Sequence, residues 1–256
     1  MRVDFVIGGT QKGGTSALDS FLRQHPEICM PTTRKELHFF DREEENTDYK
    51  KYHSNFKLKP QHRVIGEASP IYMYWETAPD RIWKYNPKMK WILALRNPVE
   101  RAFSAWNMET KRGKEKLSFA EAIEQEAERC REALPSQHRV YSYFDRGFYA
   151  HQVRRLFNTF GKDDCLILLN EELRNDHKKT LRRVFDFLGV DSLFVPPEAS
   201  VFEQEYTDKI DDRLRARLIE AFYFDIKELE RLLGRDLSRW YEKRQGSGGS
   251  PNRHGD

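Results

Sequence analysis

Cysteine is scarce in this sequence: the 256 residues include three, at positions 29, 130 and 165. An odd number of cysteines cannot pair completely into disulfides, and the three spacings match no metal-binding pattern. These features argue against a disulfide-stapled scaffold and against a cysteine-based metal module. Free thiols are typical of a reducing compartment, so we predict a cytoplasmic protein.

Long apolar runs and a large net charge are also missing. No stretch reaches the roughly eighteen apolar residues that a membrane-spanning helix needs, and no signal-peptide pattern precedes the strand-like run at residues 3–7. The 44 Lys and Arg residues nearly balance the 41 Asp and Glu residues, and they form no basic stripe. We therefore predict no membrane span and no nucleic-acid partner.

What the sequence does contain predicts an α/β fold. Aromatic residues make up 13% of the chain, which supplies a core and excludes intrinsic disorder. Longer helical patterns separate four short apolar runs that indicate buried strands, at residues 3–8, 64–67, 91–95 and 165–169. This order predicts a central, mostly parallel sheet. We expect one domain over residues 1–245 and a flexible Gly- and Ser-rich tail at 246–256.

Helix boundaries are visible at three places. Asn97 followed by Pro98 is typical of an N-cap and the first helical position. Ser118 and Glu121 have the spacing of a capping box and predict a helix over residues 119–133. Apolar residues recurring every three or four positions predict an amphipathic helix from Ile210 to Leu233.

The first strand leads into G-G-T-Q-K-G-G-T-S at residues 8–16, followed by a helical pattern. A glycine-rich turn before a helix directs backbone N–H groups and the positive helix end toward an anion. Lys12 adds a charge, and Thr15 and Ser16 add hydroxyl donors. Lys12 precedes Gly13 and Gly14, so the Walker A order fails. We predict a loop that binds phosphate-like groups without the ATP and Mg²⁺ of Walker enzymes.

A second anion site is expected after the third predicted strand. Arg96 stands where this strand ends and the next helix begins, close to that helix's free N–H groups. Ser104 lies two turns along the helix, on a face near Arg101. Two such junctions in one sheet favour a nucleotide with two separated charged groups.

These motifs resemble the PAPS-dependent sulfotransferases (PAPS is 3′-phosphoadenosine 5′-phosphosulfate), particularly the heparan sulfate glucosaminyl 3-O-sulfotransferase type and its bacterial relatives. The likeness is carried by the two anion motifs, by E-L-H-F-F-D (36–41), E-A-S-P-I-Y (67–72), R-G-F-Y-A-H-Q (146–152) and F-L-G (187–189). The resemblance implies a P-loop-like three-layer α/β/α domain. It also implies sulfuryl transfer from PAPS to a hydroxyl, or less readily an amine, with no metal.

The resemblance assigns roles residue by residue. It places the 5′-phosphosulfate on Lys12, Gly13, Gly14, Thr15 and Ser16, with Lys12 also stabilising the leaving oxygen. Arg96 and Ser104 are assigned to the 3′-phosphate. Glu36 is assigned as catalytic base and His38 as its orienting group or as the alternative base. If their segment is extended, Glu36, His38 and Phe40 share one face.

The sequence departs from the family pattern at Ala68, where the heparan sulfate enzymes resemble E-K-[TS]-P. Their acceptor therefore does not carry over directly, and Glu67 either faces the pocket or caps the strand end. The family's late basic loop has a weak counterpart in Tyr206, Thr207 and Lys209.

Other roles stay open. Tyr149 or Phe148 borders a pocket or packs in the core, and five aromatic residues either line an acceptor pocket or lie in the core: Phe39, Phe40, Tyr72, Tyr74 and Trp75. We expect a small-molecule or glycan acceptor. A P-loop kinase of a small alcohol and a non-catalytic nucleotide-binding relative remain the alternative functions.

Overall fold

The structure is a computed structural model that describes residues 1–42, 47–197 and 209–242. The strands are β1 (Phe5–Gly9), β2 (Ile28–Cys29), β3 (Val64–Ala68), β4 (Lys90–Leu95) and β5 (Cys165–Leu169). The helices are α1 (Thr15–Leu22), α2 (Tyr49–His53), α3 (Ala78–Tyr85), α4 (Pro98–Lys111), α5 (Phe119–Glu124), α6 (Glu126–Arg131), α7 (Tyr149–Phe160), α8 (Asn170–Asn175), α9 (His177–Leu188) and α10 (Asp212–Leu233), with 3₁₀ helices η1 (Asp145–Gly147) and η2 (Ser238–Trp240).

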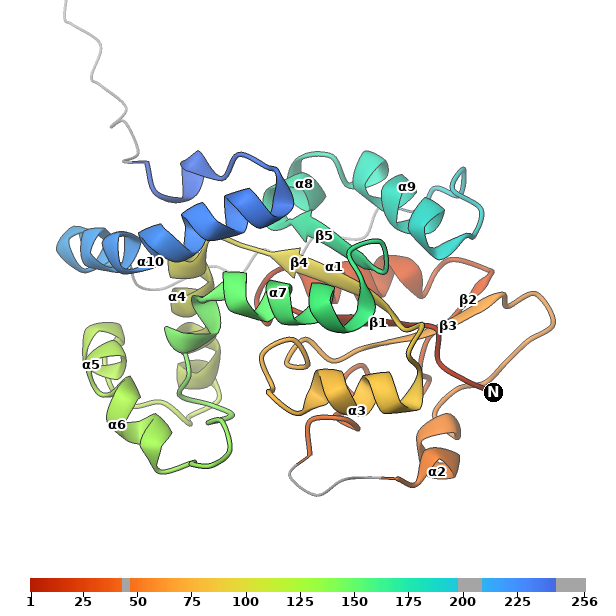
Figure 1. The fold of residues 1–256 in the computed structure, drawn as a ribbon, viewed down its shortest axis with the longest axis horizontal. Coiled ribbons are helices and arrows are strands. Elements are labelled where there is room, and N and C mark those ends of the chain that lie inside the picture. The colour runs from red at the N-terminus through yellow and green to blue at the C-terminus, as the bar shows by residue number, and fades with distance from the viewer. Residues whose placement is uncertain (43–46, 198–208, 243–256) are drawn as a thin grey trace, which may run out of the picture.

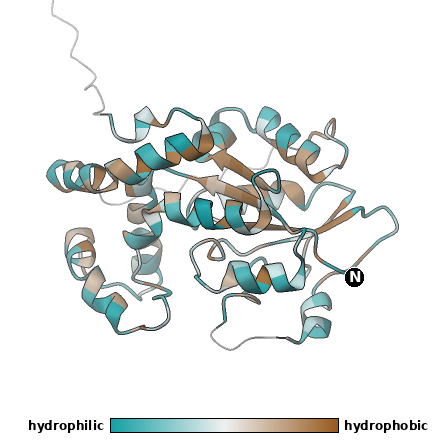
Figure 2. Ribbon diagram, in the orientation of Figure 1, coloured by the Kyte–Doolittle hydropathy of each residue, from teal (hydrophilic) through white to brown (hydrophobic). Residues whose placement is uncertain are grey.

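The strands form one parallel sheet in the order β2-β3-β1-β4-β5 (Figure 1). Successive residues of a strand point to opposite faces, and both faces are buried. Val6 belongs to the core under α3, α4, α7 and α10, whereas Phe5 and Ile7 belong to the core under α1, α8 and α9. Figure 2 shows apolar strands between helices that are polar on their outer sides. The predicted three-layer α/β/α fold is confirmed.

The four predicted strands are confirmed as β1, β3, β4 and β5. Asn97 caps α4, since its Oδ1 accepts the N–H groups of Val99 and Glu100 at 3.0 and 3.3 Å. Ser118 and Glu121 form the predicted capping box. The long amphipathic helix is α10, which begins after Asp211 and ends at a left-handed Gly234.

One helix prediction is wrong. Residues 119–133 do not form a single helix, because α5 and α6 are separated at Gln125. Next to this break, the buried carboxylate of Glu126 turns inward and accepts the backbone N–H groups of Phe144 and Asp145 at 2.7 and 2.8 Å. This contact ties α6 to the start of η1 and is invisible in the helical periodicity.

Among the described residues, no helix is both long enough and apolar enough to cross a bilayer. The predicted tail at 246–256, and with it Tyr206 and Thr207, lies outside the part of the chain that the structure describes.

Candidate functional site

The site residues follow three neighbouring strands at the carboxyl edge of the sheet. The glycine-rich loop follows β1, Ser69 follows β3 and Arg96 follows β4. Ligands of parallel α/β sheets bind at this edge. The fold therefore brings the two predicted anion motifs, which are about eighty residues apart in sequence, to one place.

Glycine is required at two positions of the loop. A Cβ on Gly13 would lie 1.9 Å from the carbonyl oxygen of Ala94 in β4. Gly14 has φ 105°, a left-handed conformation that other residues rarely adopt. Asn170 at the start of α8 donates its amide to the Gly13 carbonyl at 2.9 Å. The loop is thus pressed against β4 and held from α8, a support that the sequence did not indicate.

The N-terminus of α1 is open to an anion. Gly14 is the N-cap and provides no side-chain hydrogen bond, and the first turn contains no acidic residue. The first N–H groups of a helix need partners from outside the helix, and the helix dipole favours a negative one. Thr15 is buried and Ser16 is exposed at this end. The donor set fits a phosphate or sulfate group.

Lys12 lies among other cations beside this helix end. A guanidinium N–H of Arg96 donates to the Lys12 carbonyl at 3.4 Å. Burial, and next the charge of Arg96, lower the pKa of Lys12 to about 8, and Arg112 and Lys35 add to the effect. A bound polyanion would offset this repulsion. The positive charge therefore suits a ligand that carries several negative charges.

The two residues predicted to bind the 3′-phosphate, Arg96 and Ser104, are only partly accessible to solvent. Arg96 is partly exposed and its backbone carbonyl accepts the Tyr149 hydroxyl at 2.9 Å. Ser104 is 1% exposed on the buried side of α4. Arg96 lies at the junction of β4 and α4, and Ser104 lies within α4. Their role toward a phosphate stays a prediction.

The side chains of Glu36 and His38 are in contact, but not because they share a face of an extended segment. Their segment is not an extended strand, because His38 has φ 53° and the chain turns there. The turn brings His38 Nε2 within 3.3 Å of Glu36 Oε2. Phe40 does not share their face, since its ring is 2% exposed in the core. The hypothesis of a common face is wrong, while the juxtaposition of carboxylate and imidazole is present.

Two residues to which the sequence analysis gave no role complete this cluster. His38 Nδ1 lies 2.9 Å from Oδ2 of Asp41, whose side chain is closed to solvent. Arg139 donates to the same oxygen at 2.6 Å, and its guanidinium lies 4.2 Å from the centre of the Trp75 ring. Asp41 was within the quoted E-L-H-F-F-D motif, whereas Arg139 had no sequence signal.

These contacts set the charges of the cluster. Hydrogen bonds to Asp41 and then to Glu36 raise the pKa of His38 to about 9, so the imidazole is protonated at neutral pH. Burial alone would raise the pKa of Glu36, but the hydrogen bond with His38 and the charge of Lys35 lower it overall. Glu36 is therefore a carboxylate at neutral pH.

Lys35 contacts both the Glu36 carboxylate and the glycine-rich loop. Its Nζ lies 2.9 Å from the Ser16 hydroxyl and 3.5 Å from Glu36 Oε1. Glu36 is 38% exposed, so a substrate can reach it. The glycine-rich loop and an accessible carboxylate thus share one ammonium group.

Glu67 and Ala68, at the end of β3, are both inaccessible. Glu67 is 0% exposed and accepts side-chain hydroxyls, so it neither faces an open pocket nor caps the strand end. Ala68 packs in the core that contains Ile7 and Leu18. No side chain at position 68 supplies the cation that the heparan sulfate pattern has there.

The uncertain aromatic residues belong to the core. Phe39, Phe40, Tyr72, Tyr74, Trp75 and Tyr149 are each at most 6% exposed. Among them, Trp75 packs against the guanidinium of Arg139. None of these six rings offers an open face to an acceptor.

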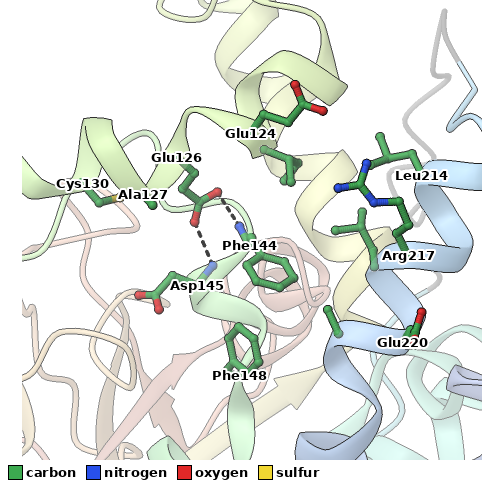
Figure 3. A pocket seen from close by; sticks show the side chains of 13 residues that line it. Glu124, Glu126, Ala127, Cys130, Phe144, Asp145, Phe148, Leu214, Arg217 and Glu220 are labelled. Atoms are coloured by element: carbon green, nitrogen blue, oxygen red, sulfur yellow. Dashed lines mark hydrogen bonds between the residues drawn. The ribbon is translucent and has the colours of Figure 1, made fainter.

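A cavity of about 710 Å³ lies between α6, η1 and α10 (Figure 3). Phe144 and Phe148 lie at its wall, and Glu126 points toward the backbone of η1, where desolvation raises its pKa to about 7. Phe148, one of the two aromatic residues expected to border a pocket, therefore lines this cavity, whereas none of the residues assigned to catalysis or to PAPS does. The cavity and the site are connected through η1, where Arg146 donates to Gln11 of the glycine-rich loop at 2.6 Å.

Comparison with known proteins agrees with this geometry. The family model of the sulfotransferase domain matches residues 2–250. Human heparan sulfate glucosamine 3-O-sulfotransferase 6 is 32% identical over 185 residues, which cover 72% of this chain and 52% of that protein. The chain thus spans about half the length of this relative.

Solved structures show the same fold. A sulfotransferase from Alicyclobacillus acidocaldarius is 34% identical, with a TM-score of 0.83 over 94% of this chain and 100% of that one. Mouse sulfotransferase SULT7A1, complexed with PAP, is 18% identical with a TM-score of 0.50 over 88% of this chain and 66% of that one. The second likeness concerns the fold alone.

Proposed function

This chain belongs to the sulfotransferase domain family, and we propose that it transfers a sulfuryl group from PAPS to a hydroxyl of a small-molecule or glycan acceptor. One observation carries the proposal. Lys35 contacts both Ser16, in the anion-binding loop, and Glu36, an accessible carboxylate. Group transfer needs a donor site and a proton acceptor held together, and this contact joins the two.

The residues present fit PAPS. The uncapped N–H groups at the start of α1, with Lys12 and Ser16, would hold the 5′-phosphosulfate. Arg96 would pair with the 3′-phosphate, with Ser104 as its predicted partner. When bound, PAPS supplies a sulfuryl group activated by its bond to phosphate. Lys12 would neutralise charge that develops on the leaving phosphate oxygen.

Glu36 is our choice for the base, in preference to His38. A protonated imidazole cannot accept a proton, and the pKa of His38 is about 9. Both ring nitrogens lie beside carboxylates, at 3.3 and 2.9 Å from Glu36 and Asp41. His38 would therefore orient Glu36, and Glu36 would take the proton of the acceptor hydroxyl. The sulfuryl group would exchange its bond to the phosphate oxygen of PAPS for a bond to the acceptor oxygen, and PAP would leave.

The cofactor can be tested before the acceptor is known. PAP (3′-phosphoadenosine 5′-phosphate) is the nucleotide that remains when PAPS loses its sulfuryl group. We expect PAP to raise the melting temperature, since a ligand at 100 times its Kd adds about 2.7 kcal/mol. Lys12→Ala should remove this shift, whereas Lys178→Ala, on exposed α9 surface, should keep it. Stabilisation by ATP with Mg²⁺ and not by PAP would overturn the proposal and favour a kinase.

Turnover is tested with ³⁵S-labelled PAPS and a panel of hydroxyl acceptors, including glycans and small alcohols, with EDTA present. Label transfer that depends on Glu36 supports catalysis. Binding of PAP with no transfer to any acceptor class would support a non-catalytic relative. As part of the same proposal we place the protein in the cytoplasm, because its three cysteines are free thiols.

A further inference from the structure

The carboxylate of Glu67 is the acceptor for three buried hydroxyls. Tyr52 and Tyr72 each donate to Oε1 at 2.8 Å, and Ser69 donates to Oε2 at 2.8 Å. Glu67 is 0% exposed, and burial raises its pKa while the three hydroxyls oppose the rise. A group this enclosed cannot touch a substrate, so any role in the reaction must act through its neighbours.

Two of the three hydroxyls also accept hydrogen bonds from the loop that carries Glu36. The Ser69 hydroxyl accepts the backbone N–H of His38 at 3.3 Å, and the Tyr72 hydroxyl accepts that of Phe39 at 3.1 Å. A hydroxyl has one proton, and in both residues it is directed to Glu67. The lone pairs of each hydroxyl oxygen therefore remain available to accept N–H groups of the loop.

The loop needs this support. His38 has φ 53°, a left-handed backbone conformation that is unfavourable for a residue with a side chain. Such a conformation persists only where surrounding contacts impose it. The contacts at the N–H groups of His38 and Phe39 lie at this turn, and the turn brings His38 beside Glu36.

We propose that Glu67 is a positioning residue for the transfer reaction: by fixing the hydroxyls of Ser69 and Tyr72, it holds the turn that pairs His38 with Glu36. The catalytic part of this inference rests on the proposed function, whereas the geometric part does not. Glu67 thereby links the end of β3 to the base at the neighbouring loop.

The protein contains a matched control for this role. Tyr52 and Tyr72 are both fully buried and donate to the same oxygen of Glu67 at the same distance. Among the described residues, the Tyr72 hydroxyl also accepts loop N–H groups, and the Tyr52 hydroxyl has no such contact. Replacing either by Phe removes one donor from Glu67, but only Tyr72→Phe also removes an acceptor of loop N–H groups.

The experiment compares Tyr72→Phe, Tyr52→Phe and Glu67→Gln. The pKa of His38 is followed by NMR in the free protein, where Glu36, Asp41 and Arg139 are the charged groups around the cluster. We expect Tyr72→Phe to move that pKa toward its ordinary value and Tyr52→Phe to leave it near 9. Glu67→Gln should behave like Tyr72→Phe, because one amide oxygen cannot accept three hydroxyls.

Kinetics provide the second readout. A misplaced base lowers kcat by about tenfold to a hundredfold, and we expect this for Tyr72→Phe and Glu67→Gln with the KM for PAPS unchanged. Tyr52→Phe should retain most of kcat at a similar loss of melting temperature. Equal effects of the two Tyr variants on His38 and on kcat would overturn the proposal. If the wild type transfers no sulfuryl group, the proposed function fails, and the NMR comparison still decides whether Glu67 holds the turn.

Discussion

Asp41 holds His38 and Arg139 on a single carboxylate oxygen, at 2.9 and 2.6 Å. The guanidinium is charged at any ordinary pH, and the carboxylate is closed to solvent. Asp41 nevertheless raises the pKa of His38 to about 9, together with Glu36. The protonated His38 in turn keeps Glu36 ionised, so a residue outside the reach of substrate sets the charge of the proposed base.

Asp41→Asn tests this arrangement. Without the negative charge, the pKa of His38 should fall from about 9 toward its ordinary value of about 6.5. The wild-type contribution of this group to stability is full below the ordinary value and is lost as pH rises through about 9. The variant should lack this loss in urea unfolding curves measured across that range. Asp145→Asn, which removes a carboxylate charge beside Tyr74 and not beside His38, is the control.

Glu36→Gln should remove catalysis and keep the nucleotide site. The amide preserves the size of the side chain but cannot take a proton, so we expect kcat to fall by about 10²–10⁴. PAP affinity, measured by calorimetry, should change little because Glu36 is not among the groups assigned to PAPS. Glu128→Gln, in an exposed pair with Arg131, should retain full activity. A Glu36→Gln enzyme with wild-type kcat would assign the base elsewhere.

Lys12 should make nucleotide affinity depend on pH. Its pKa of about 8 in the free protein means that it loses its proton just above neutrality. Binding of PAP should restore the charge, so affinity should fall as pH rises through about 8 and binding should take up protons there. Calorimetry in buffers of different ionisation enthalpy measures this uptake. Lys12→Arg stays charged, so its affinity should be flat over the same range.

The features of the fold that depend on neighbouring residues in the sequence were predictable. Four strands were visible as short apolar runs, and the caps at Asn97 and Ser118 were visible because each depends on residues within one helical turn. β2 was missed, since a strand of two residues, Ile28 and Cys29, leaves no periodicity to detect. The break between α5 and α6 was missed because the contacts of Glu126 come from a distant segment.

The candidate site was predictable to the same extent. The glycine-rich loop and Arg96 follow strands, so sheet topology alone brought them together. Arg139 reaches Asp41 across 98 positions of sequence, and no local pattern specifies such a pair. The left-handed turn at His38 likewise depends on hydroxyls that follow β3. The sequence therefore named the candidate residues, but not the contacts that set their charge and direction.

Gly13→Ala provides the most stringent test of the loop. The added Cβ would lie 1.9 Å from the Ala94 carbonyl oxygen, and the obstacle is backbone of β4 rather than a movable side chain. The loop must therefore shift away from β4, which also disturbs the Asn170 contact at the Gly13 carbonyl. We expect a folded protein with a lower melting temperature and no stabilisation by PAP.

Gly113→Ala is the control for this change, because it adds a Cβ with nothing within 4 Å at a glycine of φ 71°. It should lower stability by about 1–2 kcal/mol through backbone strain alone and leave the response to PAP intact. Circular dichroism melts with and without PAP separate the two outcomes. If Gly13→Ala still responds fully to PAP, the close approach of the loop to β4 is not needed for binding, and the nucleotide must be held mainly by Lys12, Arg96 and the end of α1.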